Sequence, residues 1–299
     1  MDRAAEGDAP LTSAWHAHRR RVVDIGYRML GTLSDAEDAA QETYTRLVRN
    51  GVDDIDDIEA WLVTVAGRVC LDKLRADTVR ARYVGPWLPE PLLAVPGAEP
   101  DPADRVTLDD SVRIALLTVL EQLTPGERLS FVLHDVFGLT FEHVAPIVGR
   151  SPVAVRKLAS RARATIRDDA EPRFDVSPRH AQAVADAFAS ACATGDLASL
   201  VALLAPDVVG EFDSGGRIAG APLGPLVGAE LVAATLIRTL SSAAATFATS
   251  LVNGQPGVVV SLHDRVMAVI SLETDGVRVF AIRSIGNPDK LAHLNPARA

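Results

Sequence analysis

The sequence predicts a multidomain chain: two all-α helical domains, followed by an α+β domain whose helices cover an antiparallel sheet. Apolar residues recur at helical spacing through most of residues 11–167. A proline-rich stretch interrupts them, and strand-like runs with turn signals dominate the end of the chain. We therefore expect a first helical domain at 1–84, a linker at 85–105, a second helical domain at 106–169 and the α+β domain at 178–294.

Composition narrows the class of protein. Of the 299 residues 48% are hydrophobic, which is ample for buried cores, yet no run of eighteen apolar residues could span a membrane. The N-terminus lacks the basic and apolar segments of a secretory signal, so we expect a cytoplasmic protein. Cys70 and Cys192 lack metal-ligand spacing and are predicted to be free core thiols. No metal or cofactor is expected.

The first domain contains a helix with an acidic face. A helix is predicted over Leu11–Leu30, and Ser34 and Glu37 have the spacing of a capping box that starts the next helix, Asp35–Arg49. Its outer face carries Asp35, Asp38, Gln41 and Glu42. The helix dipole explains acids in the first turn but not Glu42 in the third. The face is therefore either a solvated surface or a binding surface for a partner.

A further helix, Ile58–Ala76, has a basic outer face. Apolar residues such as Trp61, Leu62 and Val69 are predicted to supply its core side. Arg68, Lys73 and Arg75 lie outward. These side chains permit contact with nucleic acid, while a solvated face on a helical bundle remains the simpler alternative.

The linker is not a simple spacer. Its prolines forbid a regular helix. However, its start, Trp87-Leu88-Pro89-Glu90-Pro91, is too apolar to remain in solvent. We expect this segment to dock on a domain of its own chain.

The second domain ends in a basic helix-turn-helix. Helices are predicted over Val106–Leu123 and Pro125–Phe137, followed by two helices within Leu139–Arg167 that are joined by a turn at Gly149. Ser151 is suited to cap the last helix, with Pro152 at its first position. Six basic residues and no acidic one lie between Arg150 and Arg167. A helix charged in this way suits a groove lined by phosphates, although a solvated basic face is the alternative. The predicted DNA-binding residues are Arg156, Lys157, Ser160, Arg161 and Arg163.

The C-terminal domain is predicted to be α+β. A helical stretch at 180–204 breaks near Gly195, a strand follows at 208–212, and Gly228–Ser241 is a helix. Four strands follow at 246–252, 257–263, 266–273 and 277–284. Asn253-Gly254, His263-Asp264 and Asp275-Gly276 between them are hairpin signals, so we expect an antiparallel meander.

In their order and spacing, three blocks resemble the extracytoplasmic-function (ECF) sigma factors of bacterial RNA polymerase. SDAEDAAQETYTRLVR resembles the region-two helix that docks on the clamp helices of core polymerase. EAWLVTVAGRVCLDKLR resembles the next helix, which contacts the upstream promoter element near the start site. TPGERLSFVLHDVFGLTFEHVAPIVGRSPVAVRKLASRARATI resembles region four, whose last helix reads the −35 element. The resemblance implies two partners, core polymerase (clamp helices and flap) and promoter DNA, with no membrane association.

The remainder resembles a SnoaL-like domain of the nuclear transport factor two (NTF2-like) superfamily, a cone with an internal cavity. One actinobacterial subgroup of ECF sigma factors carries this fusion, with a Trp-Leu-Pro-Glu-Pro motif in the linker and an Asn-Pro-Asp-Lys-Leu motif near the end. Its Asp-Gly-Gly-Gly-Lys turn corresponds here to DSGGR, which departs at two positions. The resemblance implies an interdomain regulatory contact. Its residues are Trp87, Leu88, Pro89, Glu90, Pro91, Asp213, Gly215, Gly216, Arg217, Asn287, Pro288, Asp289, Lys290 and Leu291.

Three functions are open at this point. The favoured one is a non-enzymatic sigma factor regulated in cis by its C-terminal domain. A SnoaL-like cyclase or isomerase would need an acid-base residue, for which Asp207, Asp213, His263 and Asp264 are the candidates. A DNA-binding regulator would sense a small-molecule ligand in the C-terminal cavity, and such a ligand is also compatible with a sigma factor.

Overall fold

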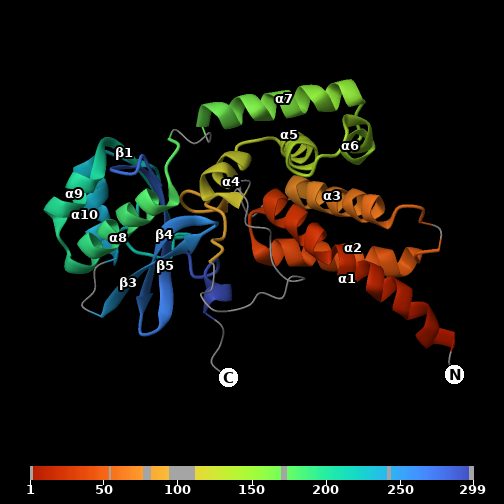
Figure 1. The fold of residues 1–299 in the computed structure, drawn as a ribbon, viewed down its shortest axis with the longest axis horizontal. Coiled ribbons are helices and arrows are strands. Elements are labelled where there is room, and N and C mark those ends of the chain that lie inside the picture. The colour runs from red at the N-terminus through yellow and green to blue at the C-terminus, as the bar shows by residue number, and fades with distance from the viewer. Residues whose placement is uncertain are drawn as a thin grey trace. The chain divides into compact units, whose positions relative to one another are not determined.

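The computed structural model describes residues 3–53, 55–76, 82–93, 112–169, 174–240 and 244–295. Its residues cluster into two compact units (Figure 1). Unit 1 comprises Met1–Asp77, Gly97–Ser111 and Ala115–Glu171, and unit 2 comprises Thr78–Pro96, Val112–Ile114 and Pro172–Ala299. The predicted linker start therefore clusters with the C-terminal residues. The predicted helix Val106–Leu123 is described only from Val112 onward.

All the secondary structure in the described residues of unit 1 is helical, as predicted. Its first three helices are α1 (Arg3–Leu30), α2 (Leu33–Asn50) and α3 (Ile58–Ala76). They pack through buried apolar side chains that include Ile25, Met29, Leu47 and Leu62. The second group comprises α4 (Ile114–Leu120), α5 (Pro125–Phe131), the π-helix η3 (Val132–Val136), α6 (Phe141–Val148) and α7 (Pro152–Asp169).

Two local predictions in unit 1 are corrected. The N-cap of α2 is Thr32, whose hydroxyl accepts from the Asp35 backbone N–H, so the capping box predicted at Ser34 is wrong. Thr32 and Ser34 are both residue types that cap helices well. The helix starts at the earlier one, because the Thr32 hydroxyl both accepts from the Asp35 backbone N–H and donates to the Asp35 carboxylate. The helix predicted over Pro125–Phe137 is α-helical only to Phe131 and then continues as the π-helix.

The two groups of helices pack on each other through α3. Gly67 makes the close approach possible, because a Cβ atom there would lie 3.0 Å from Ile147 Cγ2 of α6 and 3.4 Å from Leu133 Cδ1. Arg128 of α5, 2% exposed, donates from Nε to the backbone oxygen of Arg28 in α1 (3.1 Å). The segments at the two ends of unit 1 therefore share one core.

Unit 2 is α+β. Its helices are α8 (Pro178–Thr194), α9 (Leu197–Leu203) and α10 (Ala229–Leu240), with a short 3₁₀ helix, η4, at Ala292–Leu294. The sheet order is β2-β1-β6-β5-β4-β3. Its strands are β1 (Leu204–Asp213), β2 (Leu226–Val227), β3 (Ala245–Val252), β4 (Gln255–Leu262), β5 (Arg265–Thr274) and β6 (Val279–Ile285).

The sheet is mixed rather than antiparallel throughout. The predicted meander β3–β6 is confirmed, and its first two turns place Asn253, His263 and Asp264 at positive φ, as tight hairpins require. The first strand, β1, instead lies parallel to the last one, β6. The long connection through α10 and the meander permits this, because parallel neighbours need a crossover and not a hairpin.

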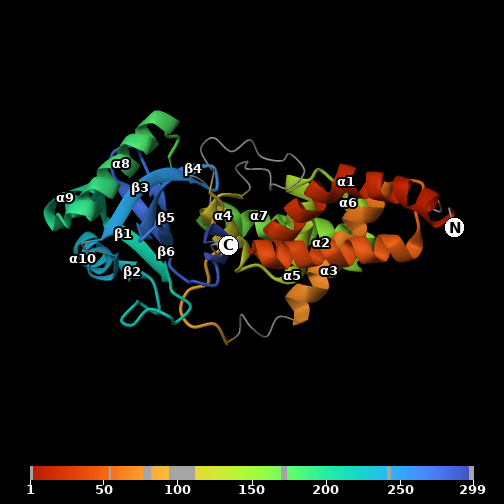
Figure 2. The ribbon, with the colours of Figure 1, turned by 90° about the horizontal axis from the view of Figure 1, so that it is seen from below.

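The two faces of the sheet carry different layers. Figure 2 shows α8, α9 and α10 on one side of the strands, where Phe188, Leu236 and Val258 belong to the main core of unit 2. A smaller cluster contains Leu88 of the linker together with Val269, Ile285 and Leu291. The linker and the C-terminal tail therefore complete the fold of unit 2.

Candidate functional site

The predicted reading helix, α7, presents its polar stripe outward. Gly149 ends α6 in the left-handed conformation at φ 74°, and the Ser151 hydroxyl accepts from the Ala154 backbone N–H (3.3 Å). Val155, Ala159 and Ala162 are buried. The side chains predicted to bind DNA are exposed at Arg156, Lys157, Ser160 and Arg161 and half-buried at Arg163.

Three of these arginines have partners within the same half of unit 1. The Arg156 guanidinium lies over the Phe141 ring, 5.2 Å from its centroid. Arg163 Nη1 lies 2.7 Å from Asp135 Oδ1, whereas Arg161 reaches Glu127 only at 3.9 Å. These partners come from α5, α6 and the π-helix, so the second helical group as a whole orients the basic face of α7.

The basic residues of α3 are placed differently. Arg68 donates to the backbone oxygen of Pro146 in α6 (3.2 Å). Lys73 lies 3.7 Å from Asp38 of α2, and Arg75 lies 3.7 Å from Asp72. The structure thus directs Arg68 toward the second helical group and Lys73 toward the acidic helix.

The acidic face of α2 is largely outward. Asp38 is 69% exposed, Gln41 is exposed, and the exposed Glu42 pairs with Arg46 one turn later. Asp35 differs, because its carboxylate accepts from the Thr32 hydroxyl (2.6 Å) and so belongs to the N-terminal cap. Asp38, Gln41 and Glu42 are the members of the predicted set that a partner can reach.

The linker motif and the C-terminal motif meet at a buried ion pair. Lys290 Nζ lies 2.6 Å from Asp213 Oδ2 and also donates to the backbone oxygen of Leu88. The ammonium lies over the Trp87 ring, 3.5 Å from its centroid, and 4.7 Å from that of Tyr83. A buried cation is stabilised there by a carboxylate, a carbonyl and two aromatic faces.

Asp213 accepts four hydrogen bonds. Oδ2 accepts from Lys290 and from the Leu88 backbone N–H (2.9 Å), and Oδ1 accepts from the Tyr83 hydroxyl and the Gly215 backbone N–H (3.1 Å). Burial raises the pKa of Tyr83, and its hydrogen bond to the Asp213 carboxylate raises it further. The phenol therefore stays protonated as a donor.

The glycine turn brings the third motif into the same cluster. Asn287 donates to the Tyr83 hydroxyl (2.7 Å), and a Cβ atom on Gly215 would lie 2.6 Å from the Asn287 amide nitrogen. Arg217 pairs with Asp289 at 3.0 Å in an exposed contact. Glycine is thus required at position 215, because any side chain there would clash with Asn287. The Arg217 side chain, in contrast, is exposed to solvent.

Sequence reasoning missed three linker anchors. Asn253 was interpreted only as a turn residue, yet its buried side chain accepts from Leu92 N (2.8 Å) and donates to Val112 O (2.8 Å). His293 lies 2.6 Å from Glu90 through Nδ1 and 2.9 Å from Pro91 O through Nε2. Tyr83 is the third. The sequence could have indicated these anchors only through a polar side chain next to a motif. The bond between Leu92 and Asn253 spans 161 residues, and contacts at such a separation leave no local sequence pattern.

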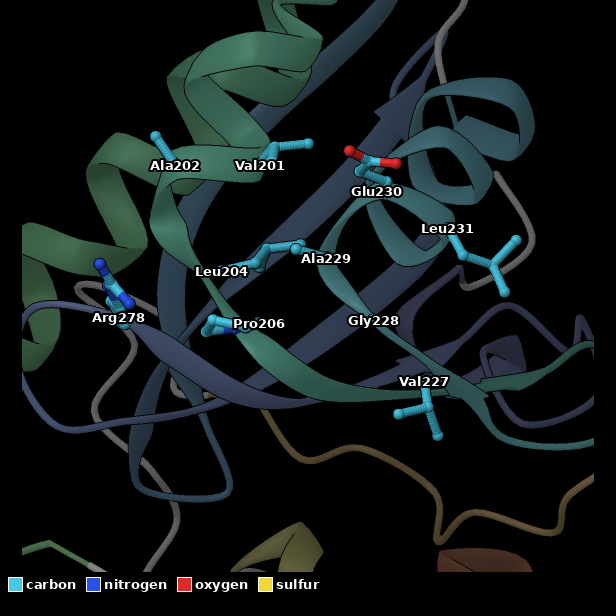
Figure 3. A pocket seen from close by; sticks show the side chains of 10 residues that line it. All are labelled: Val201, Ala202, Leu204, Pro206, Val227, Gly228, Ala229, Glu230, Leu231 and Arg278. Atoms are coloured by element: carbon cyan, nitrogen blue, oxygen red, sulfur yellow. The ribbon is translucent and has the colours of Figure 1, made fainter.

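Two hollows in the described part of unit 2 differ in size and in how open they are. The cavity beside Asp213, Ser214 and Ser284 holds about 20 Å³, enough for one water. A larger hollow of about 600 Å³ is an open groove at the ends of α9, α10 and β1, where Glu230 and Arg278 lie on opposite sides (Figure 3).

The catalytic candidates are not brought together. Asp207, His263 and Asp264 are exposed, and the last two form a hairpin turn. Asp213 is engaged with the linker. Both cysteines are free and buried, as predicted, and burial raises the pKa of the Cys70 and Cys192 thiols to about 12. None of the helices in the described part of the chain is long and apolar enough to cross a membrane.

Comparison with known proteins identifies both helical segments. Residues 14–79 match Sigma-70 region 2, and residues 113–166 match Sigma-70 region 4. The chain is 37% identical over 295 residues to the probable ECF RNA polymerase sigma factor SigI of Mycobacterium tuberculosis, covering 97% of each chain. It is 42% identical over 209 residues to the ECF sigma factor SigJ of that organism, covering 69% of this chain and 65% of the relative. The crystal structure of SigJ matches with a TM-score of 0.73 and 34% identity over 93% of this chain and 97% of that chain.

Proposed function

Since the chain belongs to the ECF sigma factors of bacterial RNA polymerase, which direct promoter-specific transcription initiation, we propose how its two units divide that work. Unit 1 binds core polymerase and promoter DNA, and unit 2 controls the linker between the two promoter-binding halves. The chain itself performs no chemistry in this account, because the polymerase makes the transcript. Its site of action is the cytoplasm, where the polymerase works.

The proposed polymerase contact is the outward face of α2, formed by Asp38, Gln41 and Glu42. An exposed acidic face suits the clamp helices as the first docking point, with the polymerase flap as a second point for the region-four half. Complementary charge would speed association and fix the orientation of the subunit.

The proposed DNA contact is the outward stripe of α7. Its basic residues would neutralise phosphates, and those with fixed orientation would read base edges. On α3, Arg68, Lys73 and Arg75 are the proposed contacts to the element near the start site. Arg68 is exposed and donates to Pro146 through one guanidinium nitrogen, so its other donors remain available in the packed arrangement of unit 1.

The observation that carries regulation in cis is the docked linker. Residues 83–93 and 112–114 belong to unit 2, where Asp213, Lys290 and Asn253 bind the linker backbone. The chain that joins α3 to α4 is thus tethered at both of its ends. Successive base pairs of B-DNA are about 3.4 Å apart, so two promoter elements that are many base pairs apart lie far from each other along the duplex. Two halves that share one core would then have to separate to reach both elements. Release of the linker would lengthen the tether and permit that separation.

A ligand-sensing or catalytic C-terminal domain is the weaker proposal. Its best candidate, Asp213, has all its bonds within the linker cluster, and the adjoining cavity has room for about one water. A small molecule would act more simply by loosening the linker than by undergoing a reaction.

The test of the cis-regulation proposal uses the full chain with purified core polymerase. Asn253→Ala removes the side-chain bonds to the backbone of Leu92 and Val112, and Trp87→Ala removes the ring over Lys290. Both variants should change promoter-dependent transcript yield, while Leu231→Ala, at an exposed position of α10, should not. Equal yields from all four proteins would refute control by the linker.

A further inference from the structure

The π-helical segment η3 contacts α7 through the hydrogen bond between Asp135 and Arg163. In η3 the Phe137 backbone N–H donates to Val132 O (3.1 Å), an i→i+5 bond that replaces the α-helical pattern. Single turns of this kind widen a helix locally and re-aim its side chains, and they occur often at functional sites. Here the re-aimed side chains are His134 and Asp135, and each leads to one arginine of α7.

Asp135 fixes the orientation of Arg163. The single bond from Nη1 to Oδ1 (2.7 Å) uses one of the five guanidinium donors and leaves the others available. The Arg163 side chain is 40% exposed, so its remaining donors can still reach a ligand. An arginine held at one edge and open at the other is preorganised for a base edge or a phosphate.

His134 supports Arg156 through Phe141. The His134 ring stacks on Phe141 with centroids 3.8 Å apart, and its Nδ1 donates to Leu139 O (2.7 Å), which fixes the ring plane. The Arg156 guanidinium lies over the same Phe141 ring, 5.2 Å from its centroid. A guanidinium laid on a ring keeps its in-plane donors free.

The two arginines are seven residues apart, so they share one face of α7 at about 10.5 Å along its axis. We propose that Asp135 and Phe141 are specificity-determining positioning residues, which hold Arg163 and Arg156 as the two base-reading side chains of α7. This inference rests on the proposed function. Lys157 and Arg161 then supply phosphate contacts without base preference.

The alternative role for Asp135 makes an opposite prediction. If the carboxylate merely masked Arg163, its removal would strengthen binding to every DNA sequence alike, because one negative charge near the duplex is lost. If it merely stabilised the fold, its removal would weaken all binding. Only a positioning role lowers discrimination at particular bases while leaving the others unchanged.

The experiment is selection from promoter DNA with a randomised −35 segment, using holoenzyme assembled from core polymerase and the full chain. Arg163→Gln and Arg156→Gln first define which base positions each arginine reads. Asp135→Asn should then lose about 3- to 10-fold of the preference at the Arg163 position only, and Phe141→Leu the same at the Arg156 position. Asp135→Glu keeps the carboxylate and should retain most of the preference. Glu142→Gln, which removes an exposed acid of α6, should change no base preference.

Each other outcome overturns the inference. Uniformly tighter binding by Asp135→Asn identifies a mask, uniformly weaker binding identifies a structural role, and an unchanged profile removes the role altogether. Loss of preference at all positions also contradicts positioning. Failure of the proposed function is separable, because wild-type holoenzyme would then select no sequence at all before any variant is compared.

Discussion

Lys290 and Asp213 form an ion pair at 2.6 Å whose side chains are 5% and 0% exposed. Two charges removed from water need further hydrogen bonds to offset the cost of desolvation. The linker supplies them, because the backbone N–H of Leu88 donates to Asp213, its carbonyl oxygen accepts from Lys290, and Tyr83 donates to Asp213. The ion pair is therefore complete only when the linker is docked, which couples the core of unit 2 to the position of the linker.

Lys290→Met should destabilise unit 2 by roughly 3–5 kcal/mol, because it leaves the Asp213 carboxylate buried without its cation. Urea unfolding gives the free-energy change, and limited proteolysis should show earlier cleavage within residues 82–93. The double variant Lys290→Met with Asp213→Asn removes both charges and should recover much of the loss. A double variant less stable than Lys290→Met would contradict this account of the pair.

The Tyr83 phenol gives a pH signature. Its folded pKa is raised, by burial and by the Asp213 carboxylate, above the unfolded value of about 10. Its contribution to stability is therefore complete below about pH 10 and is lost as the pH rises beyond it. The absorbance difference at about 295 nm between wild type and Tyr83→Phe should show no ionisation of this residue until the protein unfolds. Ionisation of Tyr83 near pH 10 in the folded protein would contradict the buried hydrogen bond between Tyr83 and Asp213.

Charge reversal on α2 tests the polymerase face. Asp38→Lys and Glu42→Lys should each weaken binding to core polymerase by about tenfold, because they place a cation on a surface that would face positive charge. Asp72→Lys is the matched control, since Asp72 is 69% exposed like Asp38 but lies on α3. Equilibrium binding to immobilised core polymerase, with circular dichroism to verify the fold, makes the comparison. Equal losses at Asp38 and Asp72 would argue against a specific face.

Gly67 reports on the packing of the two helical groups. Leucine at this position would press on Ile147 and Leu133 and should cost about 1–3 kcal/mol of unit 1 stability. If the groups must separate at a promoter, Gly67→Leu should also raise promoter-dependent transcription relative to wild type. Ala76→Leu places the same side chain at the exposed end of α3 and should neither destabilise unit 1 nor raise transcription. A destabilised Gly67→Leu protein with reduced transcription would indicate that the packed arrangement is the active one.

Local chemistry made most helices predictable. The bounds of α3 agree with the prediction at both ends, and Ser151-Pro152 correctly mark the start of α7, because apolar spacing and capping act within a few residues. The hairpins at Asn253-Gly254 and His263-Asp264 were predictable for the same reason.

Long-range pairing was not predictable from local pattern. The parallel β1–β6 pair joins strands that lie far apart in the sequence of unit 2, and Asn253 binds a linker backbone 161 residues away. The π-turn behind α7 was missed because VLHDV continues a helical pattern in sequence, and only packing reveals the changed hydrogen bonds. The linker cluster was anticipated from family resemblance, whereas its geometry, four bonds to one carboxylate, required the structure.

Run-off transcription with purified core polymerase, with and without the full chain, measures whether the chain directs promoter-specific initiation. We predict a promoter-dependent transcript only when the chain is present. The transcript should be lost with Asp38→Lys and Glu42→Lys together, and its yield should be altered by Asn253→Ala. Absence of any promoter-dependent transcript, together with failure of the chain to co-purify with core polymerase, would contradict this prediction.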